Sequence, residues 1–409
     1  MEKQKKLINK ISITLIILFI SRIGIFIPIP GIDQSEFNES ISQNTIVNFL
    51  NIFSGGGFST IGIFSLGIIP YINSSIIIQL LIKFIPSLED IQKNEGEIGK
   101  QKINRITRYL TGLWAIIQSI SIGLWIKPYT FNWNISFCSD VVITLTTGSL
   151  IIVWFSEIIT EYGIGNGTSL LIFQNIVSNI PKNLHNYIIN SNKQLTINIL
   201  LLISCIVILI INILIQDSKR KIKIIASKHL GENNKLSTQN YIPLKLNQGG
   251  VMPIVFASAA ITIPQYIVIN TKNEVLQNIF RTIISNNIIY LILYLSLILT
   301  FSYFYSSIIL NTKEISENLQ KLGANIPNTR PGEETVKYLN KIISKLTFIG
   351  ALFLFIIAQF PLLASKISQL NLLQGLGTTS LLILVGVAIE TAKQIQTYII
   401  SEQYDNIMG

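Results

Sequence analysis

Few residues in this chain have the types and the spacing that active-site chemistry requires. The run Gly163–Gly167 (Gly-Ile-Gly-Asn-Gly) resembles a loop that cradles phosphate, but no strand precedes it and apolar segments flank it. Glu157 and Glu161 stand four residues apart at the end of an apolar segment, which suits a wet interface better than a buried acid pair. We therefore interpret Gly163–Gly167 as a tight turn that needs positive φ angles.

The residue types that bind metals or act as nucleophiles are isolated from one another. His185 and His229 stand alone, without a partner at metal-ligand spacing, and Cys138 and Cys205 lie in or beside apolar stretches. The sequence contains no zinc-peptidase, serine-hydrolase or nucleotide-binding motif. We predict a protein without a catalytic site, a metal site or a cofactor.

The composition indicates a protein that crosses a membrane several times. Of its 409 residues, 49% are hydrophobic and 13% are charged, about half the charged share of a soluble domain. The basic segment Met1–Lys10 precedes the apolar run Ile11–Ile29, which is too long for a cleavable signal peptide and is followed by no small-residue cleavage site. We interpret Ile11–Ile29 as the first membrane helix.

Hydropathy predicts ten membrane helices, of which the fifth is short and polar for a span. They are Ile11–Ile29, Ile68–Ile85, Tyr109–Ile126, Val141–Ile159, Ser169–Ile180, Leu195–Ile215, Gly249–Ile269, Ile288–Leu310, Leu346–Leu363 and Thr378–Tyr398. An even number of helices places both chain ends on one side, together with two long basic segments, Gln216–Gln248 and Asn311–Lys345. That side would carry 23 Lys and Arg residues against 6 on the other, so the positive-inside rule predicts that both ends are cytoplasmic or stromal.

One stretch, Asn51–Leu81, does not have the pattern of a simple span. Three glycines at 55–57 form a flexible joint before Phe58–Leu66, an apolar segment of about two helical turns, far short of the ~20 residues that cross a bilayer. Gly67 and Pro70 then interrupt the pattern before a longer helix continues. Non-helical backbone at membrane depth must be buried in protein or line an aqueous cavity. The prediction is a half-helix that dips into a cavity, and the alternative is one kinked helix with an apolar leading loop.

The predicted spans contain no carboxylate or histidine in mid-span that would mark a proton or ion pathway. Arg22 is a charge late in the first predicted helix, and it either has a function or reaches to the nearby membrane surface. The lack of an intramembrane acid weighs against an ion-coupled transporter.

Several long stretches together resemble the SecY family, the channel subunits of bacterial and plastid Sec protein translocases. In the family's order they are Arg22–Asp33, Phe53–Leu81, Gly163–Phe173, Pro243–Ser258, Ile326–Tyr338 and Gly377–Glu390. The resemblance implies an all-α polytopic membrane protein, with ten helices in two inverted five-helix halves, approximately 1–190 and 191–409, around a central pore. It also implies a gate that opens sideways between the second, third, seventh and eighth helices.

The resemblance further assigns a plug and a pore ring. The plug that closes the outer funnel would contain Phe53, Gly55, Gly56, Gly57, Phe58, Ile61 and Phe64. The waist of the pore would be a ring of Ile68, Ile72, Thr168, Ile172, Val255 and Ile383. An apolar ring dewets and blocks ions, while branched side chains can still move apart for a polypeptide. Thr168 departs from the aliphatic pattern, and ordinary helix packing is the alternative for the isoleucines.

The basic loops match the family's docking surfaces for the ribosome and for the SecA motor ATPase. The residues concerned are Lys219, Arg220, Lys221, Arg330, Pro331 and Gly332. The prolines around Arg330 favour a fixed turn, and arginine donates in a planar fork to carboxylate or phosphate. The other partners implied are SecE-type and SecG-type subunits, translocating preproteins and membrane lipid.

The resemblance thus implies the pore-forming subunit of the Sec protein translocase, which passes unfolded preproteins and releases membrane segments through a lateral gate. The alternatives are an ion-coupled secondary transporter and a non-channel scaffold. Because the chain has no nucleotide site, a partner must supply the energy. Heavy use of isoleucine, asparagine and lysine suggests an AT-rich genome and favours a plastid (thylakoid) membrane over a bacterial inner membrane.

Single cysteines and a membrane-impermeant thiol reagent test this topology. Lys228→Cys and Lys337→Cys should be labelled only from the cytoplasmic or stromal side, because both residues lie in long basic loops. Asn132→Cys should be labelled only from the opposite side. Labelling of Lys228→Cys and Asn132→Cys from the same face would show that the helix count is wrong.

Overall fold

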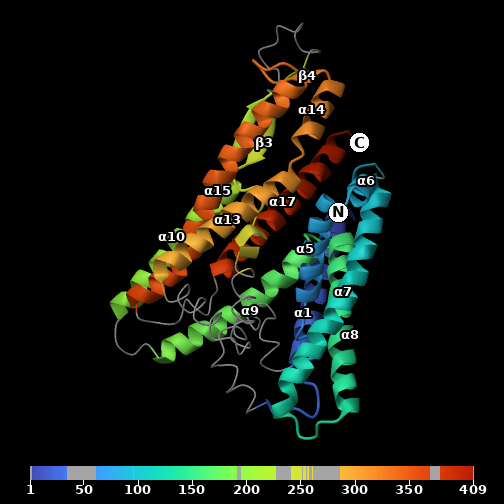
Figure 1. Ribbon diagram of the computed structural model, residues 1–409, viewed down its shortest axis with the longest axis vertical. Helices are drawn as coiled ribbons and strands as arrows, with labels where there is room; N and C mark the ends of the chain where they lie inside the picture. The colour runs from blue at the N-terminus through green and yellow to red at the C-terminus, as the bar shows by residue number, and fades with distance from the viewer. Residues whose placement is uncertain are drawn as a thin grey trace. The chain divides into compact units, whose positions relative to one another are not determined.

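A computed structural model gives the fold, and it describes residues 2–34, 61–94, 96–190, 195–226, 241–250, 252–254, 256–257, 260, 286–368 and 378–408. These residues are mostly helical (Figure 1). The chain divides into two compact units, one of Met1–Lys193 with Asn371–Gly409 and one of Gln194–Leu370. The five-helix halves implied by the sequence, 1–190 and 191–409, stay a prediction.

The first unit is built from long helices. Its helical elements are α1 (Glu2–Phe26), α5 (Ile69–Phe84), α6 (Pro86–Asn94), α7 (Gly96–Ile126), the 3₁₀ turn η1 (Lys127–Tyr129), α8 (Ile135–Tyr162), α9 (Gly167–Asn190) and α17 (Thr378–Met408). Helix α7 packs against both α5 and α8, α1 packs against α8, and α9 packs against α8 and α17. Helices α7 and α8 form a hairpin whose arms lie side by side (Figure 1).

Glycine and proline set the two ends of α5. Gly67 has a φ of 54°, and Pro70 occupies the first turn, where its missing N–H removes no helical hydrogen bond. The helix ends at Phe84, and Ile85 is extended because the residue before a proline, here Pro86, is disfavoured in the helical region. The resulting helix has 16 residues, fewer than the ~20 that cross a bilayer.

Small side chains let α7 approach its neighbours closely. Its buried positions include Thr107, Thr111, Ala115, Ser119 and Gly123, which recur every four residues. The hydroxyls of Thr107, Thr111 and Ser119 donate to backbone carbonyl oxygens four residues earlier. These buried polar groups are therefore satisfied within the helix and need no water.

In the second unit, the long helices among the described residues are α10 (Leu195–Asp217), α13 (Asn287–Ile309) and α15 (Glu333–Ser368). Helix α15 packs against both α10 and α13. The shorter elements are α14 (Thr312–Lys321), β1 (Lys219–Lys223), β2 (Ile225–Ala226), β3 (Tyr241–Lys245) and β4 (Ala324–Asn325). Strand β1 pairs antiparallel with β3, and β2 pairs antiparallel with β4.

An apolar core joins β1 and β3 to α14 and α15. Ile222 of β1 and Leu244 of β3 are buried in one cluster with Leu319 of α14 and Leu339 of α15. Burying a side chain such as that of Leu339 completely contributes roughly 1.5–3 kcal/mol to stability. Residues that hydropathy assigns to long loops therefore include a folded platform, which we define as β1, β3, α14 and the first half of α15.

The predicted membrane helices have helical counterparts, except that Gly249–Ile269 lies largely outside the described residues. Helices α7 and α15 begin well before the predicted spans, because their first turns are helical but polar and hydropathy detects only apolar sequence. Within the described ranges, five segments are long and apolar enough to cross a membrane, namely Leu7–Phe26, Gly96–Tyr129, Ile135–Tyr162, Ile288–Lys321 and Glu333–Gln359. Ile69–Ile82 and Ile206–Asp217 are shorter apolar helices.

Candidate functional site

Residues 61–68 pair with the chain that follows α1. The Ile63 N–H donates to the carbonyl oxygen of Ile27 at 3.0 Å, and the Ile29 N–H donates to that of Ile61 at 3.1 Å. Ile61 has a φ of 41°, outside the helical region. The half-helix predicted for Phe58–Leu66 is therefore wrong from residue 61 onward, because pairing with residues 27–29 replaces helical hydrogen bonds.

The rest of this segment is a run of turns that ends at α5. The Ser65 N–H donates to the Gly62 carbonyl oxygen, and the Gly67 N–H donates to that of Phe64. The carbonyl oxygen of Gly67 in turn accepts a hydrogen bond from the Ser149 hydroxyl of α8 at 3.1 Å. The non-helical backbone thus finds its partners within the protein, as membrane depth requires.

Two glycines allow this segment to pack directly on α1 and α8. A Cβ at Gly148 of α8 would collide with the carbonyl oxygen of Ile63, and a Cβ at Gly24 of α1 would collide with the Phe64 ring. The Phe64 ring also meets the Phe155 ring edge-on, with centroids 6.3 Å apart. The packing leaves no room for a larger residue at position 24 or 148.

The predicted plug residues are only partly described. Ile61 and Phe64 are 2% and 9% exposed. Ile61 belongs to a buried cluster with Ile29, Ile32, Leu66, Ile126, Val141 and Leu145. The remaining plug residues lie outside the described residues, namely Phe53, Gly55, Gly56, Gly57 and Phe58. Their role as a plug stays a prediction.

The residues predicted for the pore ring come from three helices of the first unit and from one undescribed position. Ile68 is 1% exposed and directly precedes α5, and Ile72 is half-buried in its first turn. Thr168 and Ile172 are half-buried in α9, Ile383 is 7% exposed in α17, and Val255 lies outside the described residues. Their arrangement as a ring stays a prediction.

In the glycine-rich link between α8 and α9, side chains of α1, α8 and the link itself accept hydrogen bonds from the backbone amides. The Ile164 N–H donates to the Thr14 hydroxyl at 3.0 Å, and the Gly167 N–H donates to the Thr160 hydroxyl at 2.9 Å. The Asn166 side-chain oxygen caps α9 by accepting from the backbone N–H two residues on, at 3.1 Å. Because these amides are engaged within the chain, the link is confirmed as a tight turn and is unsuited to cradle phosphate.

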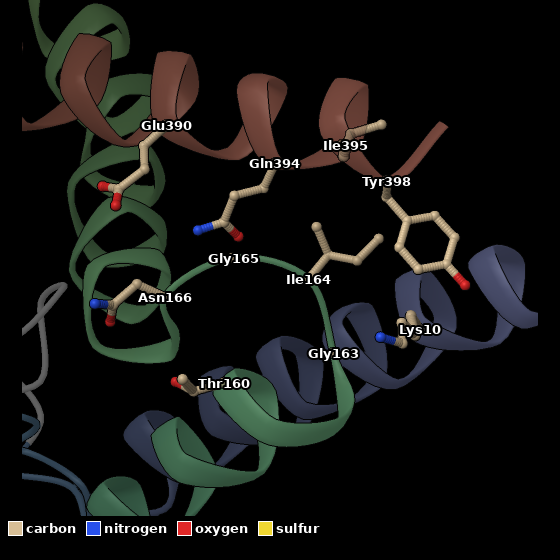
Figure 2. A pocket seen from close by; sticks show the side chains of 10 residues that line it. All are labelled: Lys10, Thr160, Gly163, Ile164, Gly165, Asn166, Glu390, Gln394, Ile395 and Tyr398. Carbon is tan, nitrogen blue, oxygen red and sulfur yellow. The ribbon is translucent and has the colours of Figure 1, made fainter. Parts of the chain in front are cut away.

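A hollow of about 310 Å³ lies between this link, α1 and α17, all within the first unit (Figure 2). It is lined by Lys10, Thr160, Gly163, Ile164, Gly165, Asn166, Glu390, Gln394, Ile395 and Tyr398. The Lys10 ammonium lies 5.2 Å from the centre of the Tyr398 ring, and the Gln394 side chain points toward the link at Gly165 (Figure 2). Charged and amide groups make this end of the unit polar, unlike the apolar surroundings of residues 61–68.

An ion pair that the sequence did not reveal connects α7 to α8. The Arg108 Nε lies 2.6 Å from a Glu157 carboxylate oxygen, and the side chains are 55% and 30% exposed. The wet interface predicted for Glu157 therefore includes a basic partner from the neighbouring helix. Such a partly exposed pair adds roughly 0–1 kcal/mol to stability. The hairpin topology could have indicated this pair, because two antiparallel helices bring the first part of α7, with Arg108, beside the last part of α8, with Glu157.

The predicted docking residues of β1 are exposed on the platform of the second unit. Lys219, Arg220 and Lys221 are all exposed, whereas Ile222 beside them is buried. Lys219 stands directly opposite Lys245 in the β1–β3 pair. The platform thus holds several cationic side chains on a buried apolar support.

Arg330 lies in a fixed turn before α15, as its flanking prolines predicted. Its backbone N–H donates to a carboxylate oxygen of Glu334 at 3.2 Å, and its carbonyl oxygen accepts from the Thr335 hydroxyl at 2.9 Å. Gly332 has a φ of 105°, and its carbonyl oxygen accepts from the Ser316 hydroxyl of α14 at 3.1 Å. The Arg330 side chain is exposed, so the backbone holds the turn and the guanidinium faces solvent.

Comparison with known proteins places these features in one family. The SecY family profile matches residues 62–392. A protein translocase subunit SecY from Porphyra purpurea is 55% identical over 410 residues, which cover 100% of both chains.

Two solved structures have a similar fold. One is described as the structure of a protein conducting channel, with a TM-score of 0.63, 18% identity, and coverage of 97% of this chain and 93% of that one. The other is described as Sec61 in the canine ribosome-channel complex from the endoplasmic reticulum, with a TM-score of 0.60, 17% identity and the same coverage. The predicted all-α, polytopic membrane fold is confirmed. The alternative of an ion-coupled secondary transporter finds no support in these relatives.

The packing of residues 61–68 on α8 can be tested with two glycine substitutions. Gly148→Ala should lower the thermal unfolding midpoint in detergent, because overpacking of this kind costs about 1–3 kcal/mol. Gly112→Ala on α7 is the matched control, since nothing lies within 4 Å of a Cβ there. The unfolding midpoint of this control should equal or exceed that of the unmodified protein, because alanine stabilises a helix by roughly 0.5–1 kcal/mol relative to glycine. Equal midpoints for the two variants would contradict the close contact.

Proposed function

The chain belongs to the SecY family of protein translocase subunits, and on that basis we propose that it forms a pore through which unfolded preproteins cross a membrane. Apolar segments leave this pore sideways into lipid. The observation that supports a pore most strongly is the run of turns at 61–68. Its contact residue on α8, Ser149, lies 14 residues from the start of that helix at Ile135, or about 21 Å along its axis. Non-helical backbone this deep in a membrane must be buried in protein or lie beside an aqueous cavity, and a plug that fills a closed pore is buried in this way.

Ile61 and Phe64 of this segment then serve as part of the plug that closes the pore. The plug comprises Phe53, Gly55, Gly56, Gly57, Phe58, Ile61 and Phe64. A plug must fill its site closely when closed, and the burial of Ile61 and Phe64 satisfies that requirement. The segment bonds to residues 27 and 29, which follow the end of α1, and to the Ser149 side chain of α8, so a passing polypeptide can displace it without unfolding either helix.

An apolar waist provides the second seal. It consists of Ile68, Ile72, Thr168, Ile172, Val255 and Ile383. A closed ring must bury its members, and Ile68 and Ile383 are 1% and 7% exposed. Thr168 can join an apolar ring, because its hydroxyl already donates to the Asn166 side chain at 2.7 Å and does not have to hold water. A constriction of this kind dewets and stops ions without any bond chemistry.

Conductance across a planar bilayer tests the waist. The double variant Ile72→Asn with Ile172→Asn should hydrate the constriction and raise the ion leak of the closed protein. Ile117→Asn with Ile143→Asn is the matched control, because these side chains are 54% and 59% exposed on α7 and α8. A leak no larger than that of the control would show that the waist isoleucines serve only in ordinary helix packing.

The platform of the second unit docks the ribosome and a SecA-type motor ATPase, which supplies the energy. Its docking residues are Lys219, Arg220, Lys221, Arg330, Pro331 and Gly332. The like charges of Lys219 and Lys245 face each other across two strands, an arrangement that an anionic partner would relieve. One structural relative, the canine Sec61 channel, forms a ribosome complex, which supports the same class of partner here.

The complete translocase would contain SecE-type and SecG-type subunits around this chain, with translocating preproteins inside it and membrane lipid outside. We assign the protein to a plastid thylakoid membrane with both chain ends on the stromal side. The distribution of Lys and Arg and the relative from Porphyra purpurea support that assignment. A bacterial inner membrane is the alternative.

The role of Arg330 can be separated from that of its turn. Arg330→Glu should abolish motor-driven translocation while membrane abundance stays normal, because exposed substitutions usually change stability by less than about 0.5 kcal/mol. Arg330→Lys should be partly defective, since lysine keeps the charge and loses the planar fork. Abundance, motor-stimulated ATPase activity and translocation should be measured on the same preparations.

Glu334→Ala is the matched control for the turn itself. It removes the acceptor of the Arg330 backbone N–H and leaves the guanidinium in place. A purely structural role predicts that both Arg330→Glu and Glu334→Ala lower the abundance and the unfolding midpoint. Full translocation by Arg330→Glu at normal abundance would show that Arg330 has no role in docking.

A further inference from the structure

A polar side chain of α9 forms hydrogen bonds with α1. The Gln174 side-chain nitrogen donates to the Leu18 carbonyl oxygen at 2.7 Å. The Ser21 hydroxyl lies 3.0 Å from the Gln174 side-chain oxygen and 2.7 Å from the Leu18 carbonyl oxygen, so its one proton can go to either acceptor. Both ends of the Gln174 amide therefore find partners on α1, which explains how the fifth predicted span accommodates a polar residue.

This bridge lies in the apolar part of α1. Leu18 and Ser21 belong to Leu7–Phe26, a segment long and apolar enough to cross a membrane. Ser21 is 2% exposed, and Gln174 is half-buried. Water cannot replace a lost partner at this depth, so the bridge favours one register of α9 against α1.

A second hydrogen bond ties the start of α9 to α1. The Ile164 N–H of the α8–α9 link donates to the Thr14 hydroxyl at 3.0 Å, three residues before α9 begins at Gly167. Thr14 and Ser21 are seven residues apart on α1. Gly167 and Gln174 are also seven residues apart on α9, and seven residues rise about 10 Å along a helix. The two contacts therefore match in spacing and hold the first two turns of α9 alongside α1.

The residues of α9 proposed for the waist lie within this held stretch. Thr168 and Ile172 both fall between the two contacts in sequence. Because each helical residue advances by about 100°, Thr168 lies about 120° and Ile172 about 160° around α9 from Gln174. Gln174 thus meets α1 on a side of α9 roughly opposite to the side that carries the waist residues. A change in how Gln174 seats α9 would shift or rotate those two side chains.

We propose that Gln174 is a positioning residue for the waist. It holds the first two turns of α9 on α1 and so keeps Thr168 and Ile172 in the ring that stops ions. As a consequence, α1 and this part of α9 move as one body when the pore opens. The proposal rests on the waist proposed above.

Ion leak across a planar bilayer tests this role. Gln174→Leu keeps most of the side-chain volume but removes the hydrogen bonds to α1, and it should raise the leak of the closed, full-length protein severalfold. Ser178→Ala is the matched control on the same helix, because the Ser178 hydroxyl donates to the Asn175 carbonyl oxygen within α9. Ser21→Ala should have a smaller effect, since the bond from the Gln174 nitrogen to Leu18 remains. Combining Ser21→Ala with Gln174→Leu should raise the leak no further than Gln174→Leu alone.

A reversible cross-link gives an independent measurement, which also serves if Gln174→Leu does not fold. In a background of Cys138→Ser and Cys205→Ser, the pair Ser21→Cys with Gln174→Cys lacks the bridge and should leak. A short bifunctional thiosulfonate reagent that joins the two cysteines should restore the low leak, and a reductant should reverse the effect. Motor-driven translocation should proceed at the same rate with the link in place, because α1 and α9 need not separate.

Three results would overturn the proposal. A leak of Gln174→Leu equal to that of Ser178→Ala would show that Gln174 has no part in the seal, even if the unfolding midpoint falls. Multiplying effects of Ser21→Ala and Gln174→Leu would show that the two residues act separately. A cross-link that blocks translocation would show that α1 and α9 move apart. A failure of the waist itself is distinguishable, because the leak of Ile72→Asn with Ile172→Asn does not depend on the role of Gln174.

Discussion

The first unit depends on satisfying the backbone polar groups of residues 61–68 away from water. In a bilayer, each group left without a partner costs several kcal/mol, which is why membrane spans are usually unbroken helices. Here the partners are the backbone of residues 27–29 on one side and the Ser149 hydroxyl of α8 on the other. These contacts bring the segment so close to α1 and α8 that a side chain at position 24 or 148 would collide with it. This explains the glycines at both positions.

The other features suit a protein that moves a polypeptide without making or breaking covalent bonds. Amides of the α8–α9 link are engaged by Thr14 and Thr160, so this glycine-rich link is structural. The proposed waist needs only apolar side chains in close contact. The platform of the second unit carries cationic side chains on a buried apolar core, and we propose it as the surface where a partner docks. Sealing, passage and docking are thereby assigned to different parts of the chain.

The sequence predicted those elements whose cause is local. Long apolar runs predicted the membrane helices, and the prolines around Arg330 predicted its turn. The strands β1 and β3 were not predicted. Four of the five residues in Lys219–Lys223 are basic, which is typical of a solvated loop, and the strand forms because Ile222 packs into a core made by distant parts of the chain. The half-helix was wrong because residues 61–63 pair with residues 27–29, a contact that periodicity cannot detect. The plug and the waist came from family resemblance, since isoleucine is too common in this chain to mark a pore.

The most direct measurement of the account is single-channel recording with and without the proposed plug. The purified chain and a variant lacking Phe53–Phe58 would be placed in planar bilayers, after both are shown to be monodisperse and helical. The account predicts that the intact chain is closed almost all the time and that the deletion opens frequently, because most of the proposed plug residues are gone. A deletion variant that stays folded and never conducts would contradict the claim that this chain encloses a pore.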